Sequence, residues 1–206
     1  MTTFFLIRHA SCSGLGQTLW GRTPGVCLNE KGKLQAQELA QRFNGIKLQA
    51  LYSSPLERAL ETAETLARSV NLDVKKSSAL NEIDFGDWTG KTFEILSTDE
   101  RWRRFNSCRS MATVPNGESF LEVQNRIVKE LDVISHQHAN ARVAIVSHAD
   151  VIRAAVGYFA ATPIDLIERI EISPCSVSVV ALDEGCATLL TINNRCELSQ
   201  MGRLIL

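Results

Sequence analysis

Two histidines in this sequence come directly after short apolar runs. The run over residues 4–7 ends at Arg8-His9, and the run over residues 143–146 ends at Ser147-His148. Such runs predict buried strands, and sites tend to gather where strands end. Imidazole can act as a nucleophile, and a guanidinium group binds anions through a fork of N–H donors. Because an ordinary surface loop can also carry an Arg-His pair, the rest of the chain has to decide between the two interpretations.

A third segment places another arginine at the start of a helix. Ser54 is expected to be the N-cap, Pro55 to occupy the first helical position, and Glu57 to complete a capping box, which fixes Arg58 in the first turn. The carboxyl ends of parallel strands share one edge of a sheet, so this helix start can meet both histidine segments. The resulting pocket would be cationic and would suit a dianion such as a phosphoryl group. These residues alone include no proton donor.

Apolar periodicity along the chain predicts an α/β fold. Strands are expected over residues 4–7, 48–52, 72–74, 143–146, 167–172, 176–182 and 187–192, and helices over about 30–43, 54–70, 119–134 and 149–159. The inner face of the first helix is expected to carry Leu34, Leu39, Ala40 and Phe43. This pattern predicts a three-layer α/β/α sandwich, with a mostly parallel central sheet and helices on both faces.

The domain organisation follows from the length and from one break in the pattern. With 206 residues, 45% of them hydrophobic and 22% charged, the chain is expected to form a single domain over residues 1–206. The segment over about residues 83–118 interrupts the alternation of strands and helices. We expect it to be an insertion that covers the active-site edge of the sheet.

Charge and cysteine content exclude several classes of partner. The net charge of −1 gives no general attraction to nucleic acid or to a membrane, and no apolar run is long enough for a membrane span. A cytoplasmic location is therefore expected, and a homodimer is left open. The six cysteines form no C-x-x-C pair and no zinc-ligand spacing, so we expect free thiols and neither metal nor cofactor. Cys12 is expected to have a structural or lining role.

Four segments in order resemble successive motifs of the histidine phosphatase superfamily, the phosphoglycerate mutase-like group. They are Arg8-His9-Ala10, Ser53-Ser54-Pro55-Leu56-Glu57-Arg58-Ala59 with Thr62-Ala63, Leu80-Asn81-Glu82-Ile83-Asp84-Phe85-Gly86-Asp87-Trp88-Thr89-Gly90, and Ser147-His148-Ala149-Asp150. The resemblance implies the family's fold and a small phosphorylated substrate. It also implies that His9 is the nucleophile that becomes phosphorylated, that Arg8, Arg58 and His148 surround the phosphoryl group, and that Glu82 is the proton donor.

The acid role of Glu82 requires a raised pKa. A free glutamate has a pKa of about 4.3, so a proton donor at neutral pH needs burial among apolar neighbours. Ile83, Phe85 and Trp88 are the expected neighbours. The nearby arginines would oppose the shift.

The sequence also departs from the family pattern behind the Arg-His pair. The family usually has Gly, then Glu or Gln, Ser or Thr, and later Asn, whereas Ala10, Ser11, Cys12 and Ser13 follow here. Candidates for contacts with the phosphate or the substrate are Ser13, Gln17, Gly21, Arg22 and Ser119, with Glu118 as a further lining residue. Ser119 also opens the helix over 119–134 in a capping box with Glu122.

The favoured function is a metal-independent phosphomonoesterase that acts on a small phosphorylated metabolite through a phosphohistidine on His9. A phosphoglycerate mutase is the first alternative, but such an enzyme commonly has a larger insertion and an ordered C-terminal tail, and here the tail over residues 194–206 is short. An inactive member that binds a phosphorylated ligand is the alternative of another class. The substrate stays open among sugar phosphates, ribazole phosphate and other small organic phosphates.

Overall fold

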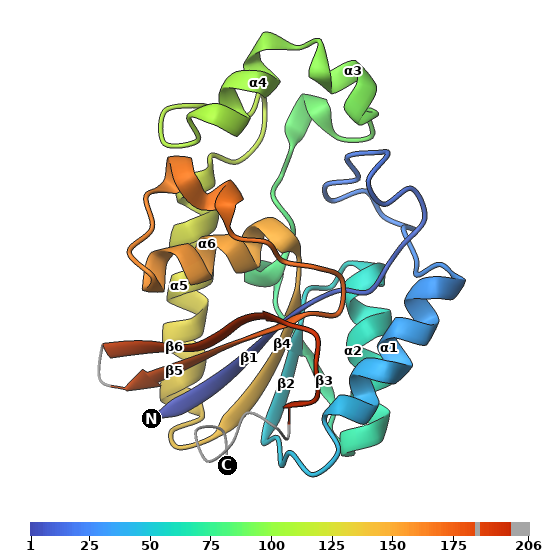
Figure 1. The fold of residues 1–206 in the computed structure, drawn as a ribbon, viewed down its shortest axis with the longest axis vertical. Coiled ribbons are helices and arrows are strands. Elements are labelled where there is room, and N and C mark those ends of the chain that lie inside the picture. The colour runs from blue at the N-terminus through green and yellow to red at the C-terminus, as the bar shows by residue number, and fades with distance from the viewer. Residues whose placement is uncertain (184–185, 199–206) are drawn as a thin grey trace.

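A six-stranded sheet forms the centre of the computed structural model, which describes residues 1–183 and 186–198. The strand order is β3-β2-β4-β1-β5-β6 (Figure 1). The strands are β1 (Thr2–Arg8), β2 (Ala50–Ser53), β3 (Val74–Lys76), β4 (Arg142–Ser147), β5 (Val177–Asp183) and β6 (Cys186–Asn194). The first four strands run parallel to one another, whereas β5 is antiparallel to β1 and β6 is antiparallel to β5.

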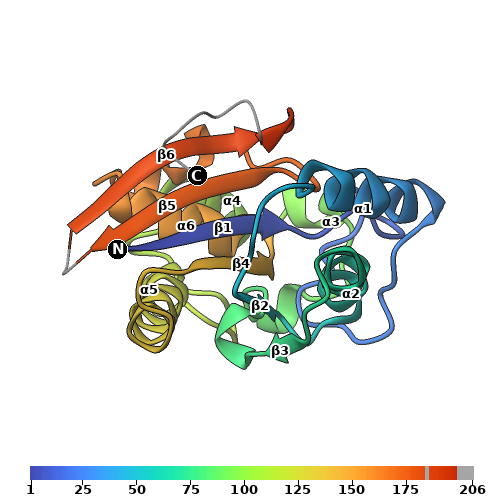
Figure 2. The same ribbon diagram turned by 90° about the horizontal axis from the view of Figure 1, so that it is seen from below.

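Helices cover both faces of this sheet. They are α1 (Glu30–Arg42), α2 (Glu57–Val70), α3 (Phe93–Ser97), α4 (Glu100–Ser107), α5 (Phe120–Gln137) and α6 (Ala149–Phe159), with the 3₁₀ helices η1 (Ser78–Leu80), η2 (Gly86–Trp88) and η3 (Ile164–Arg169). Alternate side chains of β1 enter two separate apolar cores: Phe5 and Ile7 pack with α1 and α2, and Phe4 and Leu6 pack with α5 and α6. The arrangement is a three-layer α/β/α sandwich (Figure 2).

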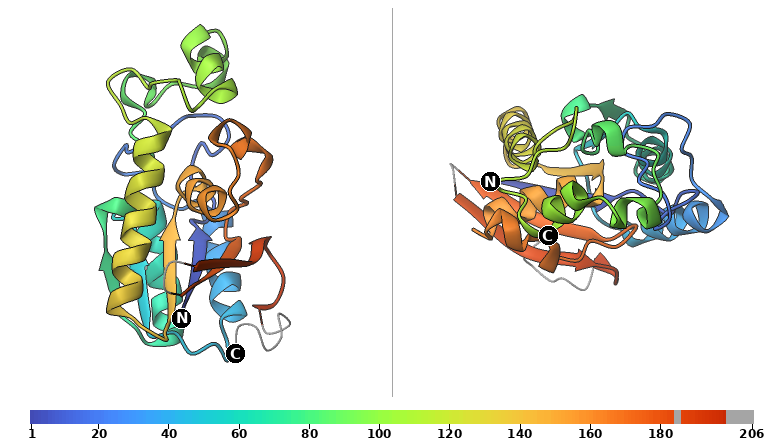
Figure 3. Two further views of the ribbon diagram at one scale, coloured as in Figure 1. Left: turned by 90° about the vertical axis from the view of Figure 1, so that its left-hand side faces the viewer. Right: turned by 90° about the horizontal axis from the view of Figure 1, so that it is seen from above.

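The segment expected to be an insertion lies beyond the carboxyl edge of the parallel strands, where it contributes η2, α3 and α4 (Figures 1 and 3). An aromatic cluster holds it together. The ring of Trp88 lies 5.3 Å from that of Trp102 and 5.6 Å from that of Phe105, both in edge-on geometry. This packing fixes a wall above the ends of β1 and β4.

Two helix starts follow local sequence signals. Asn29 caps α1 by accepting a hydrogen bond from the Gly32 N–H at 2.8 Å. Ser119 and Glu122 form the expected capping box of α5. Within the described residues, no helix is both long and apolar enough to span a membrane.

Three expectations about local structure are wrong. Residues 167–172 form no strand: the first three of them belong to η3, and only Ile167 and Ile172 are buried, so no alternating face exists. Ser54 is not the N-cap of α2, which begins at Glu57 after Leu56, and it forms no capping box. Pro55 likewise lies before the helix and is not its first residue. The Ser54 hydroxyl accepts a hydrogen bond from the Leu56 N–H at 3.3 Å and also bonds groups from other parts of the chain, as described below.

The third correction concerns Leu34, which is 61% exposed although it was expected on the inner face of α1. The buried positions of α1 include Gly32, Ala36 and Leu39, so the inner face is rotated away from Leu34. Gly32 is required there, because a Cβ at this position would lie 1.9 Å from the Ser11 carbonyl oxygen. The helix therefore packs directly against the loop that follows His9.

Candidate active site

His9 and His148 lie side by side because they follow neighbouring parallel strands. β1 and β4 pair in register up to Arg8 and Ser147, and the next hydrogen bond runs from the His9 N–H to the Ser147 carbonyl at 2.9 Å. The two imidazole rings are 5.1 Å apart between centroids. The sheet register therefore brings together two histidines that are remote in sequence.

The hydrogen bond at Nδ1 leaves Nε2 of His9 with a lone pair. Nδ1 lies 2.7 Å from the carbonyl oxygen of Ala10, so this nitrogen carries the hydrogen and donates it. Burial lowers the pKa of His9 well below its usual value, and the positive charges of Arg58 and Arg8 lower it further. His9 is therefore neutral near neutral pH, the form in which an imidazole can act as a nucleophile.

The first turns of α2 hold both Arg58 and the loop after His9. Thr62 Oγ1 accepts a hydrogen bond from the Ala10 N–H at 3.0 Å and donates to the Arg58 carbonyl at 2.7 Å. The side chain of Arg58 donates from Nη2 to the Gly21 carbonyl at 2.7 Å, while Nη1 is buried without a hydrogen-bond partner. The helix start thus delivers a fixed guanidinium group to the pocket.

Two arginines at this site have no carboxylate partner. Arg8 donates from Nη1 to the Ile172 carbonyl at 2.6 Å, and its Nε is buried without a partner. Among residues 1–183 and 186–198, neither Arg8 nor Arg58 forms an ion pair. Burial lowers the pKa of both groups, because it disfavours their positively charged forms. Buried cations of this kind are stabilised by a bound anion.

The ring of His148 is oriented by a hydroxyl. Ser54 donates from Oγ to Asn81 Oδ1 at 2.9 Å, and His148 Nε2 lies 2.9 Å from the same Oγ, where its N–H can donate. Nδ1 of His148 is buried without a hydrogen-bond partner. Burial and the charge of Arg58 lower the pKa of His148 well below its usual value. The unsatisfied nitrogen is available to a ligand at the site.

Glu82 has the raised pKa that an acid needs. Its side chain is 13% exposed, and burial raises its pKa to about 7, assisted by the negative charge of Asp150. Arg58, a hydrogen bond from the Ile83 N–H to Oε1, and Arg8 oppose that shift. Burial therefore outweighs the arginines, and the carboxyl group can carry a proton near neutral pH.

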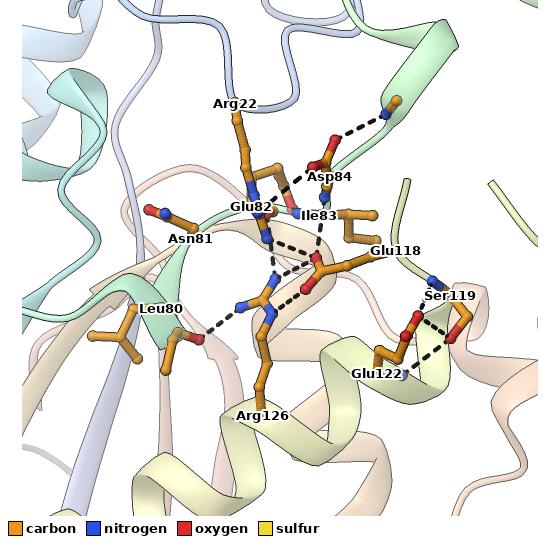
Figure 4. A network of polar contacts seen from close by, with 12 residues as sticks. Arg22, Leu80, Asn81, Glu82, Ile83, Asp84, Glu118, Ser119, Glu122 and Arg126 are labelled. Atoms are coloured by element: carbon orange, nitrogen blue, oxygen red, sulfur yellow. Dashed lines mark hydrogen bonds and ion pairs between the residues drawn. The ribbon is translucent and has the colours of Figure 1, made fainter. Parts of the chain in front are cut away.

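A carboxylate held between two arginines supports the main chain at Glu82 (Figure 4). Glu118 accepts hydrogen bonds from Arg22 Nη2 at 2.8 Å, from Arg126 Nε at 2.9 Å and from the Asp84 N–H at 3.1 Å. The same two arginines donate to the Glu82 carbonyl oxygen, at 2.9 Å and 3.3 Å. We call Arg22, Glu118 and Arg126 the Glu82 clamp.

Arg8, His9, Arg58 and Glu82 open on a cavity of about 440 Å³, whereas His148 is fully buried and does not line it. The base carries Arg8, His9, Arg58 and Glu82, with Cys12 and Gly21 beside them. One wall is mainly apolar and includes Leu15, Leu19, Trp20, Phe85, Phe93 and Trp102, and another is polar, with Asn106, Arg109, Asp150, Arg153 and Glu168. The cavity is thus suited to a small molecule with an anionic end.

The structure brings the five core residues of the sequence prediction together, but it separates most of the weaker candidates from the cavity. Among the latter, Gly21 lines it, whereas Ser13, Gln17, Arg22 and Ser119 do not. Arg22 belongs to the Glu82 clamp, and Ser119 caps α5. Glu118, expected beside the pocket, lies behind Glu82.

Sequence reasoning missed several residues of the polar wall and of the support around His148. Asn81 and Asp150 lie within motifs that were noticed, but nothing local indicated their partners. Arg109 and Arg153 are separate in sequence and meet through the carboxylates of Asp150 and Glu168. The clustered arginines of the insertion were the one available signal for Arg109.

Comparisons with known proteins identify relatives of this chain. The model of the histidine phosphatase superfamily (branch 1) matches residues 4–195. Phosphoserine phosphatase 1 of Hydrogenobacter thermophilus is 33% identical over 97% of this chain and 96% of its own length. A probable phosphoglycerate mutase of Erwinia tasmaniensis is 28% identical over 87% of this chain and 85% of its own length. Among solved structures, a mutant phosphoserine phosphatase from Entamoeba histolytica in complex with phosphoserine has a TM-score of 0.86 at 27% identity, covering 96% of this chain and all of that one.

Proposed function

Because the chain belongs to the histidine phosphatase superfamily and is a phosphatase of that group, we propose that it hydrolyses small phosphomonoesters through a phosphohistidine on His9. The observation that carries this proposal is the neutral His9, with a free Nε2, beside the buried Arg58 and the half-buried Arg8, neither of which has a carboxylate partner among the described residues.

In this proposal the phosphoryl group binds between Arg8, Arg58 and His148. Three polar atoms of these residues are buried without partners, and phosphoryl oxygens would satisfy them: Arg8 Nε, Arg58 Nη1 and His148 Nδ1. The negative charge of the substrate raises the pKa of His148 and favours its protonated form, in which Nδ1 also donates. The two arginines compensate the charge of the transferring group.

The reaction has two steps. His9 Nε2 attacks phosphorus, so that a P–N bond forms while the P–O bond to the alcohol breaks, and the carboxyl group of Glu82 gives its proton to the departing oxygen. The Glu82 carboxylate then takes a proton from a water molecule whose oxygen attacks phosphorus, and the P–N bond breaks. Inorganic phosphate leaves, and both His9 and Glu82 return to their starting forms.

The substrate is the finer part of the proposal. O-phosphoserine is the first candidate, because the relative from Hydrogenobacter thermophilus is named a phosphoserine phosphatase and matches nearly the whole chain. Phosphoryl transfer between hydroxyls of phosphoglycerate is the second candidate, because the relative from Erwinia tasmaniensis is named a probable mutase. If 3-phosphoglycerate is converted to 2-phosphoglycerate faster than phosphate is released, the second candidate replaces the first.

Trapping the intermediate tests the mechanism. Enzyme mixed with O-phosphoserine is quenched in alkali, and peptides are analysed by mass spectrometry for phosphohistidine. We expect the modification at His9, its loss in His9→Ala together with turnover, and its retention in His136→Ala, where an exposed histidine is removed. Equal phosphate release by wild type and His9→Ala would refute the proposal, as would a phosphoryl group on another residue. If neither protein released phosphate from a panel of esters, the ligand-binding alternative would be favoured.

A further inference from the structure

Four charged side chains form a cluster on the polar wall of the cavity: Arg109, Asp150, Arg153 and Glu168. They belong to three different parts of the chain, the segment after α4, the helix α6 and the helix η3. Two are positive and two negative, so the cluster carries no net charge. It therefore differs from the base of the cavity, where the arginines have no carboxylate partner within residues 1–183 and 186–198.

Asp150 links the two arginines of this cluster. Its Oδ1 accepts hydrogen bonds from Arg109 Nη1 at 3.2 Å and from Arg153 Nη1 at 3.0 Å. Glu168 forms ion pairs with the same two arginines. Asp150 stays charged in this setting, because the arginines hold its pKa below the usual value despite burial.

Arg109 acts as the fixed member of the cluster. Its guanidinium group lies 4.8 Å from the ring centre of Phe105 and 4.9 Å from that of Phe120, and its side chain is only 4% exposed. Cation–π contacts on both rings leave it little freedom. Asp150 is therefore held in place by Arg109.

Two atoms of the cluster are free to bind a ligand. Arg153 donates from Nε to the Ile170 carbonyl at 2.8 Å and from Nη1 to Asp150, whereas its Nη2 has no hydrogen-bond partner among the described residues. Oδ2 of Asp150 likewise has none in the part of the chain that the structure describes. Both residues line the cavity that contains His9. The wall thus offers one cationic donor and one anionic acceptor side by side.

The cluster also lies close to the phosphate pocket. Asp150 is in the first turn of α6, directly after His148, and Arg8 and Arg153 donate hydrogen bonds to the nearby carbonyls of Ile172 and Ile170. A phosphomonoester seated at His9 would therefore bring its alcohol portion to this wall. A donor beside an acceptor suits an alcohol portion that carries both a carboxylate and an ammonium group.

We propose that Arg153 and Asp150 select amino-acid phosphomonoesters, with Arg153 Nη2 binding the α-carboxylate and Asp150 Oδ2 binding the α-ammonium group. This inference rests on the proposed function, because the phosphate must sit at His9. A substrate with a carboxylate but no ammonium group would leave Asp150 facing an anion, which disfavours it. The cluster thus distinguishes phosphoserine from phosphoglycerate by charge pattern rather than by size.

Four esters separate the contributions of the two groups. They are O-phospho-L-serine, phosphoethanolamine with only the ammonium group, the phosphate ester of 3-hydroxypropionate with only the carboxylate, and ethyl phosphate with neither. In the wild type we expect kcat/KM for phosphoserine to exceed that for ethyl phosphate by about 100-fold, since each charged contact contributes about tenfold. The two singly charged esters should lie at least about tenfold below phosphoserine.

Variants then assign each contribution to a residue. Arg153→Gln should remove the preference for phosphoserine over phosphoethanolamine, and Asp150→Asn should remove the preference for phosphoserine over the carboxylate ester. Arg153→Lys, which keeps the charge but loses the planar fork, is a milder version of the first change. Arg169→Gln is the matched control, because Arg169 is exposed and does not line the cavity. It should keep every preference of the wild type.

The outcomes separate this inference from the proposed function. Wild-type enzyme that hydrolyses all four esters with similar kcat/KM overturns the inference alone, and this measurement needs no variant to fold. Unchanged preferences in folded Arg153→Gln and Asp150→Asn also overturn it. If none of the esters is hydrolysed, or if His9→Ala is as active as the wild type, the proposed function fails and the inference fails with it.

Discussion

Nδ1 of the buried His148 lies 3.9 Å from Oε2 of Glu82, which lines the cavity. Burial lowers the pKa of the histidine and raises that of the glutamic acid, so each group is displaced toward its neutral form. Near and below pH 7 a neutral imidazole therefore lies opposite a protonated carboxyl group. The permanent charges at the base belong to Arg8 and Arg58, which leaves the pocket cationic and ready for a dianion.

Glu82→Gln should affect esters according to their leaving groups. An alkyl ester such as phosphoserine needs a proton on the departing oxygen, so kcat should fall by about 100- to 10,000-fold. The loss with p-nitrophenyl phosphate should be much smaller, because nitrophenolate leaves without a proton. Steady-state kinetics on both substrates check this, with Glu64→Gln, an exposed glutamate on α2, as the control. An equal loss on both substrates would assign Glu82 a role other than proton transfer.

The pH profile of kcat/KM should be bell-shaped. Glu82 must be protonated to act as the acid, so activity should fall as pH rises through about 7. His9 must be neutral to attack. Because the pKa of His9 is lowered, the acidic limb of the profile should lie well below the usual pKa of a histidine. A profile that keeps rising well above pH 7 would contradict the role of Glu82.

Asp150→Asn should move the alkaline limb of that profile to lower pH. The negative charge of Asp150 raises the pKa of Glu82, so removing this charge lowers it. Ethyl phosphate is the appropriate substrate, because it has no group for Asp150 to bind. Its own phosphate ionisation is the same for both proteins, so the difference between the profiles belongs to the enzyme. A limb that stays in place or moves upward would contradict the electrostatic contribution of Asp150.

Glu118→Gln should weaken both folding and catalysis. The change removes the carboxylate shared by Arg22 and Arg126 and lowers the free energy of unfolding by about 1 to 3 kcal/mol, as the loss of hydrogen-bonded charge partners does. It should also lower kcat more than it raises KM, because the clamp holds Glu82 rather than the substrate. Urea unfolding and steady-state kinetics check this against Glu64→Gln. Wild-type kcat in a destabilised Glu118→Gln would show that the clamp serves folding alone.

Ser54→Ala should impair the binding of phosphate. The hydroxyl orients His148 through a 2.9 Å contact, and its loss leaves a buried ring nitrogen unsatisfied. We expect the inhibition constant of inorganic phosphate to rise by about tenfold, which corresponds to about 1.4 kcal/mol. Ser69→Ala, which removes an exposed serine of α2, should leave this constant unchanged. An unchanged constant in Ser54→Ala would exclude the orienting role.

Local patterns predicted much of the fold because they depend on neighbours in the sequence. The alternation of apolar runs and amphipathic stretches placed the parallel strands and the main helices, and the capping box of Ser119 is formed within one turn. The interpretation of Ser54 was wrong for the opposite reason. Its hydroxyl bonds Asn81 and His148, which arrive from elsewhere in the chain, and its local bond from the Leu56 N–H lies before the helix that begins at Glu57.

The sequence by itself determined which residues end the strands and therefore which side chains can share the carboxyl edge: Arg8, His9, Arg58 and His148. Tertiary structure decided how those side chains act. Burial set the direction of the pKa shifts of the catalytic groups, and the packed insertion forms part of the cavity wall. Contacts between distant parts of the chain form the Glu82 clamp and the charged cluster at Asp150. Desolvation and ion pairing depend on atoms that lie close in space. No pattern of neighbouring residues fixes them before the chain has folded.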